Sequence, residues 1–194
     1  MAIDRSRDAL IVVDLQPDFM PGGPLAVAEG DQIAAPIGRL AGRFSTVVAT
    51  QDWHPGGHVS FAERGGPWPP HCVAGSAGAE VHDALPDELV TLKIRKGTHV
   101  DVDSYSGFRD DEGRVTGLAG YLRDRGVGRL YVVGLARDFC VRATAIDGAR
   151  AGFEVFVVDD LTRAVDPASR TRVDAELADA HVGIVSSAAL DERA

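Results

Sequence analysis

The sequence has little positive charge and no cluster of it. Its 194 residues include 20 lysines and arginines against 29 aspartates and glutamates, which gives a net charge of −9. A protein that neutralises phosphate groups gathers basic side chains on one surface, so we do not expect nucleic acid or an anionic membrane as a partner. The apolar runs are also only a few residues long, far short of the roughly 20 that a transmembrane helix needs.

Cysteine is equally scarce, and the chain has no repeats and no low-complexity tails. The two cysteines, Cys72 and Cys140, lie far apart in the sequence. In a reducing compartment such a pair serves chemistry or burial more often than a disulfide. The N-terminus, MAIDRSRDAL, carries charges where a signal peptide needs its apolar centre, so we expect a cytoplasmic protein. Length and a hydrophobic content of 45% predict one globular domain over residues 1–194.

Short apolar runs alternate with helical patterns along the chain. The apolar runs predict strands at 9–13, 46–50, 89–94, 130–133, 153–158 and 182–185. Helical spacing predicts helices at 31–44, 115–125, from 138 onward and 167–180. Asp31 is a plausible N-cap of the first helix, although Pro36 suggests that this helix begins later. The alternation predicts an α/β fold, a six-stranded parallel sheet with helices on both faces in a Rossmann-like three-layer sandwich.

Cys140 lies at the predicted start of the helix that follows strand 130–133. The free amide hydrogens and the positive dipole end of a helix stabilise a thiolate there. The same amides can stabilise an oxyanion on a carbonyl that the thiolate attacks. The alternative is a buried, inert cysteine, which is common. The neighbouring chemistry has to decide between these two interpretations.

Charged residues follow the other predicted strands. Asp14 comes directly after the first strand, where it could take the proton of a nearby thiol as a general base. Lys96 follows the third strand; it would lower the pKa of the thiol and of Asp14 if it reached them, and otherwise it is a solvated surface residue. Sites in such sheets lie beyond the carboxyl ends of the strands, so we expect Asp14, Asp52 and Cys140 to converge.

A long loop from about residue 51 to residue 78 is rich in Gly, Pro, His and Trp, which is typical of a functional loop. It supplies one carboxylate and three imidazoles, from Asp52, His54, His58 and His71. This donor set suits a divalent transition metal such as zinc, iron or manganese. Alternatively, the histidines only pack the loop together. Cys72 could add a soft ligand, but we expect it to be a packing residue.

Six segments together resemble the nicotinamidase/pyrazinamidase family of the isochorismatase-like cysteine hydrolases. They are VDLQPDF at 13–19, QDWHP at 51–55, WPPHC at 68–72, KG at 96–97, DSYSGF at 103–108 and GLARDFCV at 134–141. The segments occur in the order of the family over nearly the whole chain. The resemblance implies the isochorismatase-like α/β fold, with a parallel six-stranded sheet and helices on both sides. It also implies hydrolysis of nicotinamide to nicotinate and ammonia in NAD salvage, and of pyrazinamide to pyrazinoate, through a thioester on Cys140.

The resemblance also implies four sets of site residues: the catalytic triad Asp14, Lys96 and Cys140; the ligands of one divalent metal ion, Asp52, His54 and His71, with His58 in a fourth position that varies among members; the substrate-binding residues Phe19, Trp68 and Tyr105; and an oxyanion hole of the Ala136 and Cys140 amides. The peptide Leu135–Ala136 matches the place where the family has a cis bond. The implied partner is a small amide, and the chain is expected to be a monomer or a small homo-oligomer.

One departure from the family pattern is Arg137, which stands where members commonly have a small Thr or Ser. We expect this position near the mouth of the pocket, so Arg137 leaves the amide substrate open. Two alternatives remain. Isochorismatases and carbamoyl-amide hydrolases share the fold, although they lack the metal site. A non-catalytic module that binds a metal or nicotinamide is the alternative of a different class.

Overall fold

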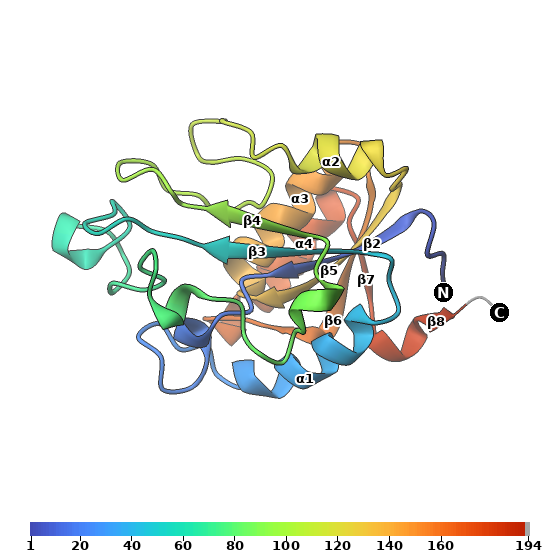
Figure 1. The fold of residues 1–194 in the computed structure, drawn as a ribbon, viewed down its shortest axis with the longest axis horizontal. Helices are drawn as coiled ribbons and strands as arrows, with labels where there is room; N and C mark the ends of the chain where they lie inside the picture. The colour runs from blue at the N-terminus through green and yellow to red at the C-terminus, as the bar shows by residue number, and fades with distance from the viewer. Residues whose placement is uncertain (193–194) are drawn as a thin grey trace.

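The computed structural model describes residues 1–192, and a six-stranded sheet forms its centre (Figure 1). The strand order is β4-β3-β2-β5-β6-β7, and every neighbouring pair is parallel. The strands are β2 (Asp8–Val13), β3 (Thr46–Asp52), β4 (Leu92–Lys96), β5 (Arg129–Leu135), β6 (Glu154–Arg163) and β7 (Gly183–Val185). A two-stranded parallel sheet joins β1 (Ala2–Ile3) to β8 (Asp191–Glu192). The predicted fold class is confirmed.

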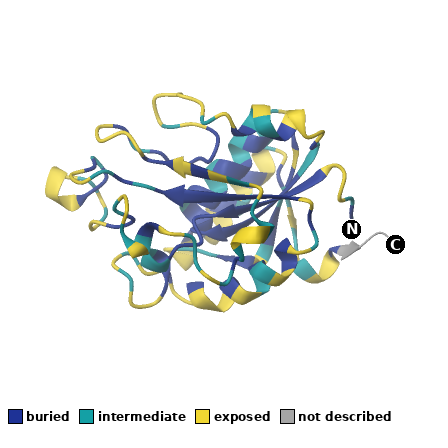
Figure 2. Cartoon of the chain, viewed as in Figure 1, coloured by how far each residue is buried: buried dark blue, intermediate teal, exposed yellow. Residues whose placement is uncertain are grey.

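Helices cover both faces of the sheet. One face packs against α1 (Gly30–Ala41), and the other carries α2 (Leu118–Asp124), α3 (Arg142–Arg150) and α4 (Arg170–Asp179). Along β2 the side chains of Leu10 and Val12 point into the core on the α1 side, while Ile11 and Val13 point into the core on the other side. Burial on both faces explains why this strand is a continuous apolar run (Figure 2).

Two strand boundaries differ from the prediction. β4 begins at Leu92, because Asp87–Leu89 forms a 3-10 turn before it. β6 runs on to Arg163, well beyond the predicted end at residue 158. Its pairing with β5 shifts in register after Val132, so that Thr162 and Arg163 still pair with the end of β5. The acidic residues in this extension hide it from an analysis based on apolar runs.

The starts of the helices also differ: α3 begins at Arg142, and α4 begins at Arg170 after a 3-10 turn. α1 begins at Gly30, not at Pro36, and the residue before it is Glu29 in a left-handed conformation with φ 58°, so Asp31 is not its N-cap. Pro36 lies inside α1 on a half-buried position. The carbonyl that loses its amide partner there belongs to the exposed Gln32, where water can bind it. α2 starts only at Leu118, after Gly117 with φ 90°.

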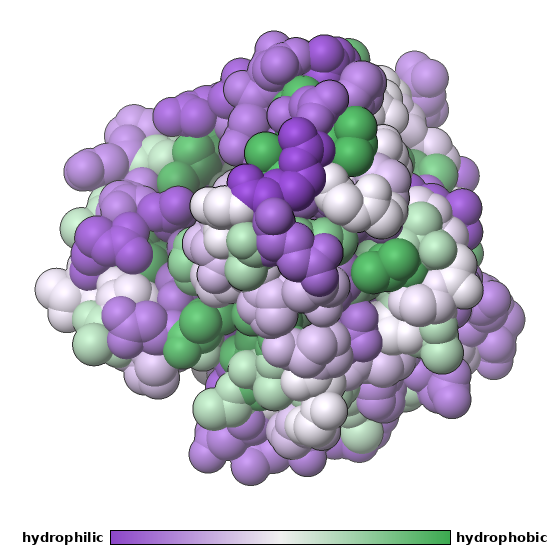
Figure 3. All heavy atoms as spheres, turned by 90° about the vertical axis from the view of Figure 1, so that its left-hand side faces the viewer, coloured by the Kyte–Doolittle hydropathy of each residue, from purple (hydrophilic) through white to green (hydrophobic). Residues whose placement is uncertain are grey.

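The carboxyl ends of the parallel strands meet at the left of Figure 1, where long loops extend beyond the sheet. The longest connects β3 with β4 and contains the His-rich stretch of the sequence. Figure 3 turns this end toward the viewer and shows separate hydrophobic groups among mostly hydrophilic atoms. Among the described residues, no helix combines the length and the apolar character needed to cross a membrane.

Candidate active site

Lys96 is at the centre of a buried cluster of charged side chains. Its Nζ lies 2.9 Å from Asp14 Oδ2, 2.6 Å from Asp52 Oδ1 and 3.3 Å from Cys140 Sγ. Asp14 directly follows β2, and Asp52 and Lys96 are paired at the ends of β3 and β4. The parallel register therefore carries three distant segments to one edge. The structure brings together the three residues of the predicted triad.

Cys140 lies in a π-helical turn, η5 (Arg137–Val141), between β5 and α3. The sequence pattern predicts the first turn of an ordinary helix here. The amides of Phe139 and Val141 both donate to the carbonyl of Ala136, each at 3.1 Å. The peptide Leu135–Ala136 is cis, as the resemblance implies. Single π-turns of this kind occur frequently at functional sites.

The protonation states in this cluster follow from burial and from the charge of Lys96. Burial opposes the ammonium, but the carboxylates of Asp14 and Asp52 outweigh it and raise the pKa of Lys96 well above its usual value. Burial raises the pKa of Asp14 and that of the Cys140 thiol, although Lys96 pulls both pKa values down. Lys96 acts in the expected direction, but it does not outweigh burial. Cys140 therefore rests as a thiol, and a base has to remove its proton.

The carboxyl group of Asp14 is held by Thr50, a residue of β3. The Thr50 hydroxyl donates to Asp14 Oδ1 at 2.6 Å, and the Asp14 amide donates to Thr50 Oγ1 at 3.2 Å. This hydrogen bond favours the carboxylate over the acid. Sequence reasoning missed Thr50, since a threonine in an apolar strand carries no pattern that distinguishes it.

Asp52, His54 and His71 form a second cluster beside the first. Their ligand atoms all lie within 4.8 Å of one another. Asp52 Oδ2 is 3.7 Å from His54 Nε2 and 3.9 Å from His71 Nε2. His54 Nδ1 contacts the Gly97 carbonyl at 3.0 Å, and His71 Nδ1 contacts the Pro69 carbonyl at 2.8 Å.

These backbone contacts decide which nitrogen can bind a metal. A carbonyl only accepts, so Nδ1 of His54 and of His71 must donate, and the lone pair is left on Nε2, which faces Asp52. One carboxylate oxygen and two imidazole nitrogens thus converge, with both imidazoles oriented by hydrogen bonds to the backbone. This donor set fits a divalent transition metal.

His58 differs from the other two histidines. Its ring stacks on that of His54, with 4.2 Å between centroids. Its Nε2 contacts the Val102 carbonyl at 3.1 Å, and its Nδ1 contacts Ser60 Oγ at 2.8 Å. Both ring nitrogens are therefore engaged, and His58 is outside the group of three described above. To bind a metal, the ring would have to release one of these contacts.

The backbone of Asp52 is clamped by Gln16. The Gln16 side chain donates from Nε2 to the Asp52 carbonyl at 2.9 Å and accepts from the Asp52 amide at Oε1, also at 2.9 Å. Both residues are buried. Gln16 belongs to one of the six resembling segments, but sequence reasoning gave it no role. These two hydrogen bonds fix the backbone of Asp52, whose carboxylate contacts residues of both clusters.

Aromatic side chains contact one another beside Cys140 and His71. Trp68 Nε1 donates to the Tyr105 hydroxyl at 3.2 Å, and Phe139 lies edge-on to Trp68 with 5.0 Å between ring centroids. Phe19 lies 5.6 Å from the ring of His71. The structure thus places the three predicted wall residues around the two clusters. Phe139 is a wall residue that the sequence analysis missed, although its position directly before Cys140 could have suggested it.

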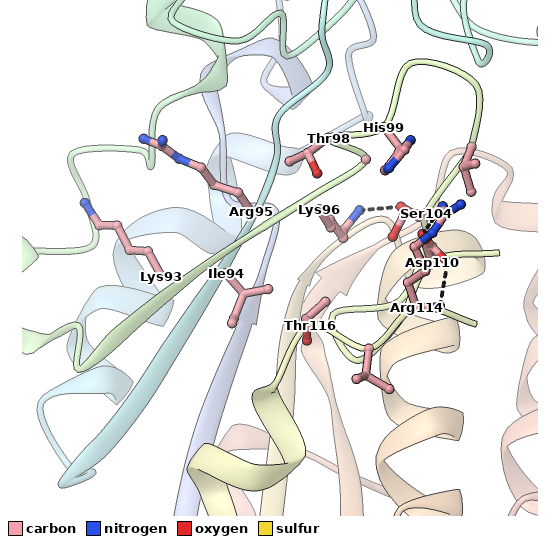
Figure 4. A pocket seen from close by; sticks show the side chains of 13 residues that line it. Lys93, Ile94, Arg95, Lys96, Thr98, His99, Ser104, Asp110, Arg114 and Thr116 are labelled. Atoms are coloured by element: carbon pink, nitrogen blue, oxygen red, sulfur yellow. Dashed lines mark hydrogen bonds and ion pairs between the residues drawn. The ribbon is translucent and has the colours of Figure 1, made fainter. Parts of the chain in front are cut away.

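A cavity of about 270 Å³ borders Lys96, between β4 and the loops that follow it (Figure 4). Lys96 and Ser104 line it, and the ammonium donates to the Ser104 carbonyl at 3.1 Å. Asp14, Asp52 and Cys140 are not among its lining residues. We therefore locate the chemistry on the Cys140 side of Lys96.

Arg137, which the sequence places near the mouth of the pocket, is held by residues outside the two clusters. Its side chain is buried and pairs with Asp159 and Asp174, on β6 and α4. Its charged group is therefore engaged by carboxylates that belong to neither cluster.

Comparisons with known proteins agree with this geometry. The family model described as an isochorismatase domain matches residues 8–189. The nicotinamidase of Acinetobacter baylyi is 49% identical over 175 residues, which cover 81% of this chain and 82% of that protein.

Two solved structures are similar over most of the chain. That of PnC1 from L. infantum in complex with nicotinate has a TM-score of 0.97 and 46% identity, and the match covers 100% of this chain and 99% of that one. That of the pyrazinamidase of Pyrococcus horikoshii in complex with zinc has a TM-score of 0.85 and 46% identity, with coverage of 93% and 99%.

Proposed function

The chain belongs to the isochorismatase family, and we propose that it is an amidohydrolase that converts nicotinamide to nicotinate and ammonia in NAD salvage. Pyrazinamide, converted to pyrazinoate, is a second substrate. The observation that carries this proposal is the contact of Lys96 Nζ with both Asp14 and Cys140. A buried thiol with a carboxylate beside it, held by an ammonium, is suited to attack the carbon of a small amide.

In the proposed reaction Asp14, whose carboxylate lies within 4.8 Å of the Cys140 sulfur, accepts the proton of Cys140 as the thiolate attacks the amide carbon. The oxyanion that forms is held by the backbone amides of Ala136 and Cys140. Asp14 then returns the proton to the departing nitrogen, and ammonia leaves. Water, deprotonated by Asp14, hydrolyses the remaining thioester on Cys140 to release the acid and restore the thiol.

Lys96 remains charged throughout this sequence, because the pKa of its ammonium is raised by its acidic neighbours despite burial. Its positive charge limits the cost of placing Asp14, Asp52 and a developing thiolate in one buried space. Without Lys96 these negative charges would repel one another at close range. Its proposed role is therefore electrostatic, and it transfers no proton.

Asp52, His54 and His71 are proposed to hold one divalent transition metal ion, with His58 in a fourth position after it releases a ring contact. The zinc bound to the related Pyrococcus pyrazinamidase supports this choice, and iron and manganese fit the same donors. When bound, the ion would supply a Lewis acid for the ring nitrogen of the substrate. Phe19, Trp68, Tyr105 and Phe139 would hold the ring itself.

The setting of the reaction follows from the sequence. We propose a cytoplasmic enzyme that acts on a small amide, and an acidic chain without basic tracts disfavours nucleic acid and anionic membranes as partners. We propose that the enzyme acts as one domain over residues 1–194, in a monomer or a small homo-oligomer.

Release of ammonia from nicotinamide, with and without a metal chelator, tests the proposal. We expect turnover by the untreated protein, strong loss after chelation and recovery when a divalent ion is added. Activity that survives full removal of metal would favour the related metal-free hydrolases. No ammonia from nicotinamide, with metal bound and the thiol intact, would refute the proposed substrate.

A further inference from the structure

The residues of the turn that carries the nucleophile make two kinds of contact. Arg137 and Asp138 are buried against the scaffold, whereas Phe139 joins the aromatic wall and Cys140 contacts Lys96. Four consecutive residues of η5 therefore divide into two that anchor the turn and two that face the site. The anchoring side chains are charged, so burial requires that they find partners.

Arg137 finds them in a closed network of four charges. Its Nη1 lies 2.9 Å from Asp159 Oδ1, and its Nη2 lies 2.7 Å from Asp174 Oδ1. Arg170 bridges the same two carboxylates, at 2.9 Å from Asp159 and 3.5 Å from Asp174. Arg137 Nη1 also donates to the Thr162 hydroxyl at 3.1 Å. The network joins the nucleophile turn to β6 and α4.

Asp138 fixes the same turn from the next position. Its Oδ1 accepts from the Val165 amide at 3.0 Å, and its Oδ2 accepts from the Asp166 amide at 2.9 Å. These amides belong to the segment between β6 and α4. Two adjacent side chains of η5 thus attach the turn to the same pair of elements. Asp138 acts through the backbone, and Arg137 acts through side-chain charges.

We propose that Arg137 is a positioning residue: through Asp159 and Asp174 it holds η5, and with it Cys140 and its backbone amide, in register with Asp14 and Lys96. It does not select among substrates. The planar guanidinium spans two carboxylates on different elements at once, and its donors are fixed in one plane, whereas a lysine offers a single flexible ammonium. A shift of about 1 Å in a reacting group can cost roughly 100-fold in rate, so a modest loosening of the turn should be measurable.

The claim about catalysis rests on the proposed function, whereas the claim about the turn can be measured without a substrate. The variants are Arg137→Met, Arg137→Lys, Asp174→Asn and the double variant Arg137→Met/Asp174→Asn. Arg172→Met is the matched control, because Arg172 lies on α4 and pairs with Glu176, outside the network of Arg137. Steady-state kinetics with nicotinamide and pyrazinamide are normalised to the folded fraction. Hydrogen exchange of the peptide over 136–142 is followed by mass spectrometry.

We expect Arg137→Met to lower kcat by about 10-fold or more for both substrates, with KM within about twofold and their ratio of kcat/KM unchanged. Arg137→Lys should recover part of the loss. Asp174→Asn should also lower kcat, and the double variant should be no worse than Arg137→Met, because both act through one network. Exchange in 136–142 should quicken in Arg137→Met and stay as in wild type in Arg172→Met.

A changed ratio of kcat/KM between nicotinamide and pyrazinamide, or a raised KM with kcat intact, would mean that Arg137 takes part in substrate binding. Either result would overturn the proposal. Unchanged exchange and unchanged kcat per folded molecule would also overturn it, even if the melting temperature fell. If wild type failed to hydrolyse nicotinamide, the proposed function would fall, yet faster exchange in Arg137→Met would still support the role in holding the turn.

Discussion

Asp52 and Lys96 connect the two halves of the site through one carboxylate. Asp52 Oδ1 accepts from Lys96 Nζ at 2.6 Å, and Oδ2 of the same group lies 3.7 Å from His54 Nε2. The charge of Lys96 and the bond to His54 together hold the pKa of Asp52 below its usual range, although burial opposes this. One oxygen thus serves the catalytic cluster and the other the candidate metal cluster, so loss of Asp52 would damage both. The predictions below therefore use residues that belong to one cluster only.

Replacing the nucleophile should abolish turnover and spare the fold. Cys140→Ala exchanges one small buried side chain for another, so the free energy of unfolding should fall by only about 1 kcal/mol. Turnover of nicotinamide should fall by roughly 10⁴-fold or more. Mass spectrometry of enzyme quenched during turnover should find the acyl group on Cys140.

Cys72 is the internal control for that experiment. It is fully buried, and burial raises the pKa of its thiol far above the usual range, so it should stay unmodified. An adduct on Cys72, or substantial activity in Cys140→Ala, would remove Cys140 from the mechanism.

Much of this architecture could be predicted because its signals are local. A parallel strand buried on both faces has to be apolar along its length, so β2 and β5 stand out in the sequence. The polar residues that follow such strands then converge at one edge, as Asp14 and Lys96 do. The extension of β6 past Val158 had no such signal, since it contains charged residues and is paired with β5 only through Thr162 and Arg163.

The support around the site was harder to predict for a different reason. Thr50 and Gln16 act through hydrogen bonds to Asp14 and Asp52, and such contacts depend on spatial neighbours that spacing does not reveal. The direction of Arg137 is a similar case: its partners on β6 and α4 come more than 20 residues later in the chain. The segment resemblance placed it near the site but did not show where its side chain points.

The candidate metal ligands should not contribute equally. Unchelated protein should contain about one divalent transition ion per chain by elemental analysis. His54→Ala and His71→Ala should each lose it, because both present a free Nε2 toward Asp52. His58→Ala should lose less, since the ring nitrogens of His58 are already hydrogen bonded. Full metal content in all three variants would place the metal elsewhere.

Gly97 should be essential to the orientation of His54. A Cβ at this position would lie 2.4 Å from Cε1 and 2.5 Å from Nδ1 of the His54 ring. Gly97→Ala should therefore displace the ring and weaken metal binding by about 10-fold or more. Gly113→Ala is the matched control, because Gly113 also has a positive φ but has no atom near its Cβ direction. Metal titration should separate the two variants; equal affinities would show that the ring can move without cost.

The fall of kcat/KM at low pH, which is the acid limb of the pH profile, should depend on Thr50. Asp14 must be ionised to accept a proton, and burial raises its pKa, so kcat/KM should fall as the pH drops through that raised pKa. The Thr50 hydroxyl opposes this rise by donating to Asp14 Oδ1. Thr50→Val should therefore move the acid limb to higher pH. Thr46→Val, at the far end of β3, should leave it in place, and a shared shift would rule out the hydrogen bond as its cause.

The two clusters should differ in which substrates they affect, because they act on different parts of the molecule. Asp14 moves a proton at the amide, so Asp14→Asn should collapse kcat for every amide alike. His54 is proposed to act through the ring nitrogen, an interaction already present in the bound substrate. His54→Ala should therefore raise KM for nicotinamide strongly, with a smaller fall in kcat from poorer orientation. Benzamide has the same carboxamide without a ring nitrogen, so His54→Ala should lower kcat/KM less for benzamide than for nicotinamide. The measurement is the ratio of kcat/KM for nicotinamide over benzamide, which should fall in His54→Ala and stay near the wild-type value in whatever activity Asp14→Asn retains. If His54→Ala lowered kcat/KM for both substrates by the same factor, this cluster would not bind the ring nitrogen. Its contribution would then lie in holding Asp52 and Lys96.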